Sequence, residues 1–219
     1  MINQPPPYLD DGEPVFIKLA SHSKAPQKGN SASEGPFYRS TDPELRDHIK
    51  NGGNVGRVLR DDIIAFDIDD RELLDELEDW PETLVIKSGG DGVGYHYYYR
   101  CPGWNENQRE LRLGSVNIGG VRSGNSYCLA PPSVHDETGN RYTVETSHDP
   151  AEVSSSRISG LLDEYGKAAN TGGGGGGARC VGGSPVPSIP EEYPSRSADW
   201  NQMAGWLEAN GLLSYLNKT

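Results

Sequence analysis

Apolar residues recur along the chain in two rhythms that separate strands from helices. Short apolar or alternating runs, bounded by Gly, Asn, Asp and Pro, predict strands at residues 14–19, 63–69, 83–88, 94–100, 126–130 and 141–145. Helical spacing predicts a short helix at residues 42–50 and an amphipathic helix at 72–80 with three leucines on one face. Asp69 or Asp70 is the predicted N-cap of the second helix, and Pro81 ends it. This pattern indicates an α+β or α/β layout.

The composition changes abruptly after residue 165. Residues 172–177 are six consecutive glycines, followed by a stretch rich in Gly, Ser and Pro. Such composition predicts a flexible linker. We expect a domain at 1–168, a linker at 169–196 and a tail at 197–219, whose apolar residues have helical spacing typical of a helical hairpin or docking helix.

Composition excludes several classes of protein. No apolar run approaches the roughly 20 residues that cross a bilayer, and the first residues lack the regions of a signal peptide. We therefore expect a cytoplasmic protein with no membrane partner. Cys101, Cys128 and Cys180 are widely spaced and form no CxxC pair, so they predict reduced thiols and no zinc knuckle.

The chain is strongly acidic. Its 32 Asp and Glu residues against 20 Lys and Arg give a net charge of −12, the opposite sign from most general nucleic-acid binders. Because Arg outnumbers Lys by 13 to 7, one interpretation is a salt-rich cell interior, where repulsion between surface charges is screened. The alternative is an ordinary acidic cytosolic domain.

Two carboxylates stand at the end of a buried strand. In residues 66–69 the alternation of a strand places Asp67 and Asp69 on one face, with Phe66 and Ile68 on the other. Carboxylates about 7 Å apart on a rigid strand can hold the divalent cations used in phosphoryl transfer. The same pattern also fits a helix N-cap turn.

Two further segments carry groups that bind phosphate. Residues 86–96 predict a strand, a glycine-rich turn at Gly89 and a second strand, with Lys87, Ser88 and His96 as side-chain donors. Arg122 opens the turn before the strand at 126–130, where its planar guanidinium suits a phosphate. The simpler interpretations are a structural histidine and a surface ion pair.

Taken in order, these segments resemble the primase–polymerase (prim-pol) domain of the archaeo-eukaryotic primase superfamily, found in plasmid and viral replication proteins. The resemblance covers residues 14–145: an opening strand with a Lys-Ala-Pro element, the Asp-Ile-Asp strand, the Ser-Gly-rich hairpin ending in His96, and Ala130–His135 followed by a Gly-Asn-Arg-Tyr step. It implies an α+β fold, with a mixed, mostly antiparallel sheet flanked by helices. It also implies that Asp67 and Asp69 bind catalytic Mg²⁺ or Mn²⁺ and that His96, Lys87, Ser88, Gly89 and Arg122 hold the nucleotide.

The resemblance therefore predicts a DNA primase/polymerase that transfers nucleotides from nucleoside triphosphates onto a primer on a single-stranded DNA template. A helicase or another replication protein is the expected partner of the tail. One departure matters: where the family has a third metal-binding carboxylate, this chain has Gly120 or, in a looser alignment, Asn117, and Glu110 is a candidate replacement. The alternatives are a catalytically degenerate nucleotide- or DNA-binding replication accessory and a structural α+β protein.

Overall fold

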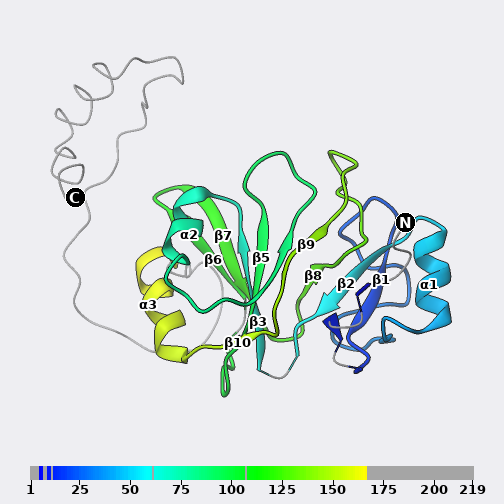
Figure 1. Ribbon diagram of the computed structural model, residues 1–219, viewed down its shortest axis with the longest axis horizontal. Coiled ribbons are helices and arrows are strands. Elements are labelled where there is room, and N and C mark those ends of the chain that lie inside the picture. The colour runs from blue at the N-terminus through cyan, green and yellow to red at the C-terminus, as the bar shows by residue number, and fades with distance from the viewer. Residues whose placement is uncertain (1–4, 7–8, 11, 61, 107, 167–219) are drawn as a thin grey trace, which may run out of the picture. The chain divides into compact units, whose positions relative to one another are not determined.

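The computed structural model describes residues 5, 6, 9, 10, 12–60, 62–106 and 108–166. Within them the chain forms two β-sheets and three helices (Figure 1). The elements are, in chain order, β1 (Phe16–Leu19), α1 (Pro43–Lys50), β2 (Asn54–Val58), β3 (Ile63–Ile68), α2 (Arg71–Glu76), β4 (Leu84–Lys87), β5 (Tyr95–Arg100), β6 (Arg109–Leu113), β7 (Val116–Arg122), β8 (Tyr127–Leu129), β9 (Thr143–Ser147), β10 (Ala151–Glu152) and α3 (Ser155–Tyr165).

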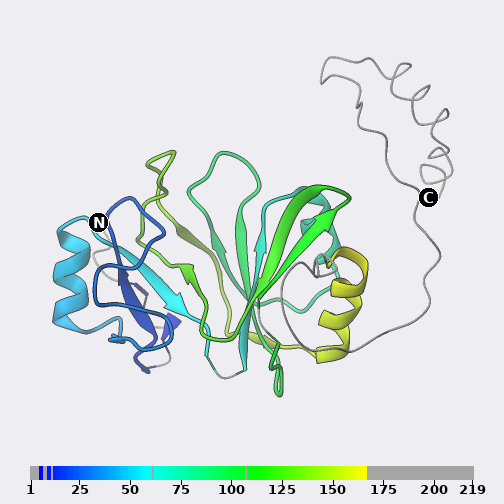
Figure 2. The same cartoon turned by 180° about the vertical axis from the view of Figure 1, so that it is seen from behind.

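The larger sheet has the strand order β6-β7-β3-β5-β4-β9, with β10 paired to β5. All of its pairings are antiparallel except that of β10 with β5. On the central strand β3, Phe66 and Ile68 point to the face that packs against α2 and α3, through residues such as Leu73 and Ile158. Figure 2 shows α3 (yellow) against the hairpin of β6 and β7 (green). The opposite face of β3 is left for Ala65 and Asp67.

The smaller sheet has the order β1-β2-β8 and lies beside α1 (Figure 1). Its apolar side chains form a second core with Leu45 of α1 and with residues from the other sheet, including Ala65, Ile86 and Tyr98. The two sheets are therefore packed through one face of β3, β4 and β5. This packing brings β8 and the chain that follows β1 over the face of the larger sheet that carries Asp67.

The structure confirms the predicted α+β class and the mixed, mostly antiparallel pairing. Each of the six predicted strands and both predicted helices is present, although the amphipathic helix ends at Glu76, before the predicted Trp80. Asp70 is its N-cap, because its side chain accepts a hydrogen bond from the Glu72 N–H. Five elements were not predicted: β2, β6, β7, β10 and α3. In β6 and β7, charged residues and glycines hide the alternation of a strand.

Two predicted segments lie outside the described residues: the linker at 169–196 and the helical tail at 197–219. The structure therefore does not test the predicted docking of the tail on a partner. Among the residues that the structure does describe, no helix has both the length and the apolar character needed to cross a bilayer.

Candidate functional site

Three neighbouring strands place their central residues in one row across the larger sheet. Asp67 on β3 is in register with His96 on β5 and with Gly120 on β7. Directly opposite residues of antiparallel strands point to the same face, and neighbouring strands lie about 4.8 Å apart. The side chains of Asp67 and His96 therefore meet on the face that α2 and α3 do not cover.

Both carboxylate oxygens of Asp67 contact nitrogen-bearing side chains. Oδ1 lies 3.4 Å from His96 Nε2, and Oδ2 accepts hydrogen bonds from Arg122 Nη2 at 2.8 Å and Nε at 3.2 Å. Burial acts to raise the pKa of Asp67, but His96 and the Arg122 guanidinium together hold this pKa well below its usual range. Burial likewise acts to lower the pKa of Arg122, which Asp67 nevertheless raises overall. Asp67 is thus a charged and already paired carboxylate.

Asp69 lies just beyond the end of β3, where its backbone N–H donates to the Ile118 carbonyl at 3.0 Å. Its side chain is exposed overall and its carboxylate lines the same cavity as Asp67. Partial loss of water there, followed by the negative charge of Asp67, raises the pKa of Asp69. Within the described part of the chain, no hydrogen-bond donor occupies this carboxylate, so it is open to an incoming cation.

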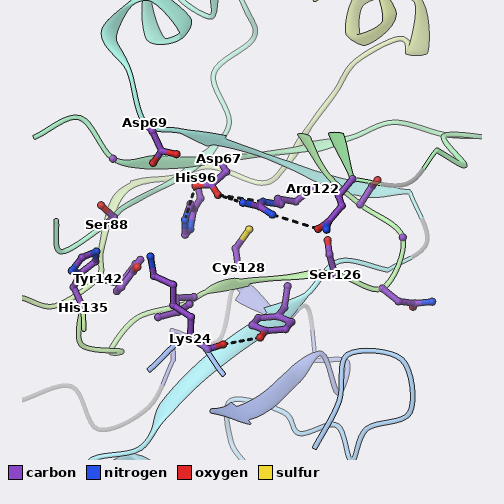
Figure 3. Close-up of a pocket in the computed structure, with 17 residues that line it drawn as sticks. Lys24, Asp67, Asp69, Ser88, His96, Arg122, Ser126, Cys128, His135 and Tyr142 are labelled. Atoms are coloured by element: carbon purple, nitrogen blue, oxygen red, sulfur yellow. Dashed lines mark hydrogen bonds and ion pairs between the residues drawn. The ribbon is translucent and has the colours of Figure 1, made fainter. Parts of the chain in front are cut away.

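A cavity of about 760 Å³ lies over the row, with walls from both sheets. One wall carries Asp67, Asp69, His96 and Arg122, and the other is formed by β8 and by Lys24, which follows β1. Figure 3 shows Lys24 extending toward His96, with Arg122 to one side. A cavity of this size matches those that hold small-molecule ligands.

The glycine-rich turn between β4 and β5 contributes Ser88 to the cavity. The Ser88 hydroxyl accepts a hydrogen bond from the Gly90 N–H at 3.3 Å and lies where a Cβ on Gly94 would be, 2.1 Å away. Gly94 is therefore required for close packing. The hydroxyl and the backbone of this turn offer donors suited to an anion.

The structure does not bring Lys87 or Gly89 to the cavity. Lys87 is in register with Tyr95, on the face opposite to His96, and its Nζ lies 5.9 Å from the centre of the Tyr95 ring. Gly89 packs against the loop after β8: a Cβ there would meet the Asn140 carbonyl oxygen at 2.4 Å. Its close packing accounts for this glycine without a ligand.

Tyr142 and His135 are two of the cavity residues that were not predicted as site residues from the sequence. The ring of Tyr142 lies between those of His96 and His135, with centroids 5.8 Å and 6.1 Å away. His135 Nδ1 accepts a hydrogen bond from the Glu137 N–H at 3.3 Å and lies 3.6 Å from Asp136 Oδ1. In the neutral ring that accepts this bond, Nε2 carries the proton. His135 therefore presents a second imidazole donor near Gly90, where an added Cβ would lie 3.6 Å from Nε2.

A buried asparagine, Asn54 on β2, binds the backbone next to both Lys24 and His135. The Asn54 side-chain amide donates to the carbonyls of Ser23 and Val134 at 3.2 Å and 2.8 Å, and its oxygen accepts from the Val134 N–H at 2.8 Å. Each of these partners precedes a cavity residue by one position. Asn54 thus fixes both segments relative to β2.

The donor set suits a single divalent cation. Asp67 and Asp69 are hard oxygen ligands on one wall of the cavity, and such ions complete their shell with water or phosphate oxygens. Gly120, opposite Asp67, supplies no third carboxylate. Glu110 follows in the same row but accepts hydrogen bonds from Arg112, the shorter at 2.9 Å. In the described residues, no three Asp, Glu, His or Cys side chains are grouped as a metal cluster.

The structure therefore gathers five of the seven residues predicted from the sequence, Asp67, Asp69, Ser88, His96 and Arg122. Lys24, His135 and Tyr142 join them. The sequence did contain a signal for these three, because each lies in a segment that carries the family resemblance.

Comparison with known proteins gives one family match. The sequence model described as bifunctional DNA primase/polymerase, N-terminal, matches residues 7–156, which is more than half of the chain. A search of curated proteins finds no significant match.

Proposed function

Because the chain belongs to the bifunctional DNA primase/polymerase family, whose chemistry is nucleotidyl transfer, we propose that its cavity binds a nucleoside triphosphate and transfers the nucleotide to a primer. The observation that carries this proposal is the charge balance of the cavity. In a chain of net charge −12, Lys24 and Arg122 balance Asp67 and Asp69, so the charges of the lysine, arginine and aspartates that line the cavity sum to zero. A cavity with this balance of charge accepts a polyphosphate that arrives with a divalent cation.

The residues divide into two groups in this proposal. Asp67 and Asp69 would hold Mg²⁺ or Mn²⁺, and Lys24, Ser88 and His96 bind the phosphates. None of the ion pairs among the described residues includes Lys24, so its ammonium is available to an anion in the cavity. The chemistry that the bound cation supplies is neutralisation of the charge on the reacting phosphates.

The bond changes are those of primer extension. The 3′-hydroxyl oxygen of the primer attacks the α-phosphate and its proton passes to solvent water. The bond to the β-phosphate breaks, and pyrophosphate leaves with the charge that Lys24 and His96 stabilise. His135, whose Nε2 faces the glycine-rich turn, adds a donor near the same phosphates.

A single-stranded DNA template is the proposed second substrate, as the family implies. The net charge of −12 limits the number of template phosphates that the chain can neutralise. We therefore expect weak template binding with a shallow dependence on salt.

Incorporation of labelled nucleotide on primed single-stranded DNA, with Mg²⁺ or Mn²⁺, tests the proposal. Asp69→Asn should abolish incorporation, because it removes the open carboxylate of the cavity. Asp75→Asn is the matched control, since Asp75 is an exposed residue of α2 that lies 3.9 Å from Arg71 and outside the cavity. Full incorporation by Asp69→Asn would show that this site does not perform the transfer.

A second function is favoured by one observation, the glycine opposite Asp67. Without a third carboxylate, the same cavity would serve a replication accessory that binds nucleotide and does not transfer it. Equilibrium binding of nucleotide together with no incorporation at any metal concentration is the result that would select this second function.

A further inference from the structure

Arg122 occupies a position on Asp67 that a metal ion would otherwise need. Its guanidinium donates from Nη2 and Nε to the same oxygen, Oδ2. Arginine stays protonated at any relevant pH, and its planar fork is suited to a lasting pair with a carboxylate. Gln108 supports the arrangement, since its Oε1 accepts from Arg122 Nη1 at 3.4 Å.

The strand that carries Arg122, β7, has no carboxylate that could hold a second ion beside Asp67. Gly120 lies two residues before Arg122 on β7, directly opposite Asp67. A Cβ on Gly120 would approach the Arg109 carbonyl oxygen of β6 to 2.8 Å, so any side chain at this position requires the backbone of β6 to shift. β7 thus offers a permanent cation and no anion beside Asp67.

We propose that Arg122 replaces one of the two divalent ions of metal-dependent nucleotidyl transfer, so that the cavity takes up a single ion with its nucleotide. The proposal rests on the proposed function, because it concerns the same nucleotide site. One positive charge at Oδ2 of Asp67 is supplied by the chain itself. The single ion is left to Asp69, to the phosphates and to Asp67 Oδ1, which it would share with His96 Nε2 at 3.4 Å.

Mn²⁺ binding, followed through the electron paramagnetic resonance signal of the free ion, tests this proposal without any turnover. The parent, loaded with a non-hydrolysable nucleoside triphosphate, should bind about one Mn²⁺ per chain. Without nucleotide, Arg122→Gln should bind Mn²⁺ about tenfold more tightly than the parent, because Asp67 loses its competing cation. Arg122→Lys, which keeps the positive charge, should stay within about twofold of the parent.

The matched control is Arg109→Gln on the neighbouring strand. Arg109 is paired with Glu106 at 3.5 Å and lies outside the cavity, so its loss should leave Mn²⁺ binding unchanged. Circular dichroism and urea unfolding establish that each variant is folded. If Arg122→Gln does not fold, the number of Mn²⁺ ions bound to the nucleotide-loaded parent still tests the proposal.

Two results overturn the proposal: about two Mn²⁺ ions bound to the nucleotide-loaded parent, or a folded Arg122→Gln with the Mn²⁺ affinity of the parent. If the parent binds two ions and Glu110→Gln binds one, Glu110 supplies the third carboxylate. If the parent binds no nucleotide, the proposed function fails, while the nucleotide-free affinities of the Arg122 variants still test Arg122 itself.

Discussion

Neutralising the two cavity aspartates one at a time should have opposite effects on stability. Asp67→Asn removes a paired charge, whereas Asp69→Asn removes a charge that no described residue neutralises by direct contact. Both substitutions keep the shape of the side chain, and the two residues lie on the same cavity wall. The pair therefore separates the structural role of one carboxylate from the ligand role of the other.

The magnitude for Asp67→Asn follows from its contacts. Arg122 donates two hydrogen bonds to Oδ2, at 2.8 Å and 3.2 Å, and His96 Nε2 lies 3.4 Å from Oδ1. Hydrogen bonds to charged groups contribute about 1.5–3 kcal/mol, and breaking a buried ion pair costs more. The Arg122 side chain is 39% exposed, so water replaces part of the loss. We expect a loss of about 2 kcal/mol in the free energy of unfolding, or about 4–8 °C in Tm.

For Asp69→Asn we expect a gain of no more than about 0.5 kcal/mol near neutral pH. The raised pKa of Asp69 means that the folded chain holds this proton more tightly than the unfolded chain, so ionisation of Asp69 destabilises the fold as pH rises. The lowered pKa of Asp67 has the opposite sign: its stabilisation is present above the unfolded pKa of about 3.9 and is lost as pH falls through the folded pKa. Both differences from the parent should therefore shrink below about pH 4.

Urea unfolding of the parent and the two variants, near neutral pH and at about pH 3, measures these differences. Asp75→Asn, on the exposed face of α2, should change stability by less than about 0.5 kcal/mol at either pH. If Asp67→Asn is no less stable than Asp69→Asn near neutral pH, the pairing of Asp67 with Arg122 does not stabilise the fold and the reasoning is wrong.

Two further contrasts test the cavity and its frame. Lys24→Ala should weaken nucleotide binding about tenfold in an equilibrium titration, whereas Lys87→Ala, on the other face of the sheet, should stay within about twofold; equal effects would contradict the assignment of the two lysines. Gly119→Ala should cost more than about 3 kcal/mol in urea unfolding, because its φ is +147° and a Cβ there would lie 2.1 Å from the Asp67 carbonyl oxygen. Gly114→Ala in the same hairpin has a φ of +58° and open space around it, so it should cost only about 1 kcal/mol; a Gly119 variant as stable as this control would contradict the close packing of β3 and β7.

The parts of the site that could be predicted from the sequence are those set by local alternation. Asp67 and Asp69 share the cavity wall because residues two apart on a strand share a face. The same rule places His96 on the face opposite to its neighbour Tyr95, and the pairing of β3 with β5 sets His96 directly beside Asp67.

The other parts of the site, such as the positions of Lys87 and Lys24, depend on the register between strands and on contacts with segments far away in the sequence. Lys87 is next to Ser88 in sequence, yet pairing with Tyr95 directs it away from the cavity, and that register is a property of two strands together. Lys24 reaches the cavity because Asn54 and Tyr127 hold its segment, through contacts separated by 31 and 103 positions in the chain. No periodicity within a short window contains such information.

The closeness of β6 to Gly120 makes a carboxylate at this position hard to accommodate. A substitution that introduces an acid at this position meets the Arg109 carbonyl oxygen before it can reach the cavity. Placing a third ligand at Gly120 therefore requires the backbone of the neighbouring strand β6 to shift. An engineered third ligand is therefore better introduced on the opposite wall of the cavity, which is formed by β8 and by the segment that carries Lys24.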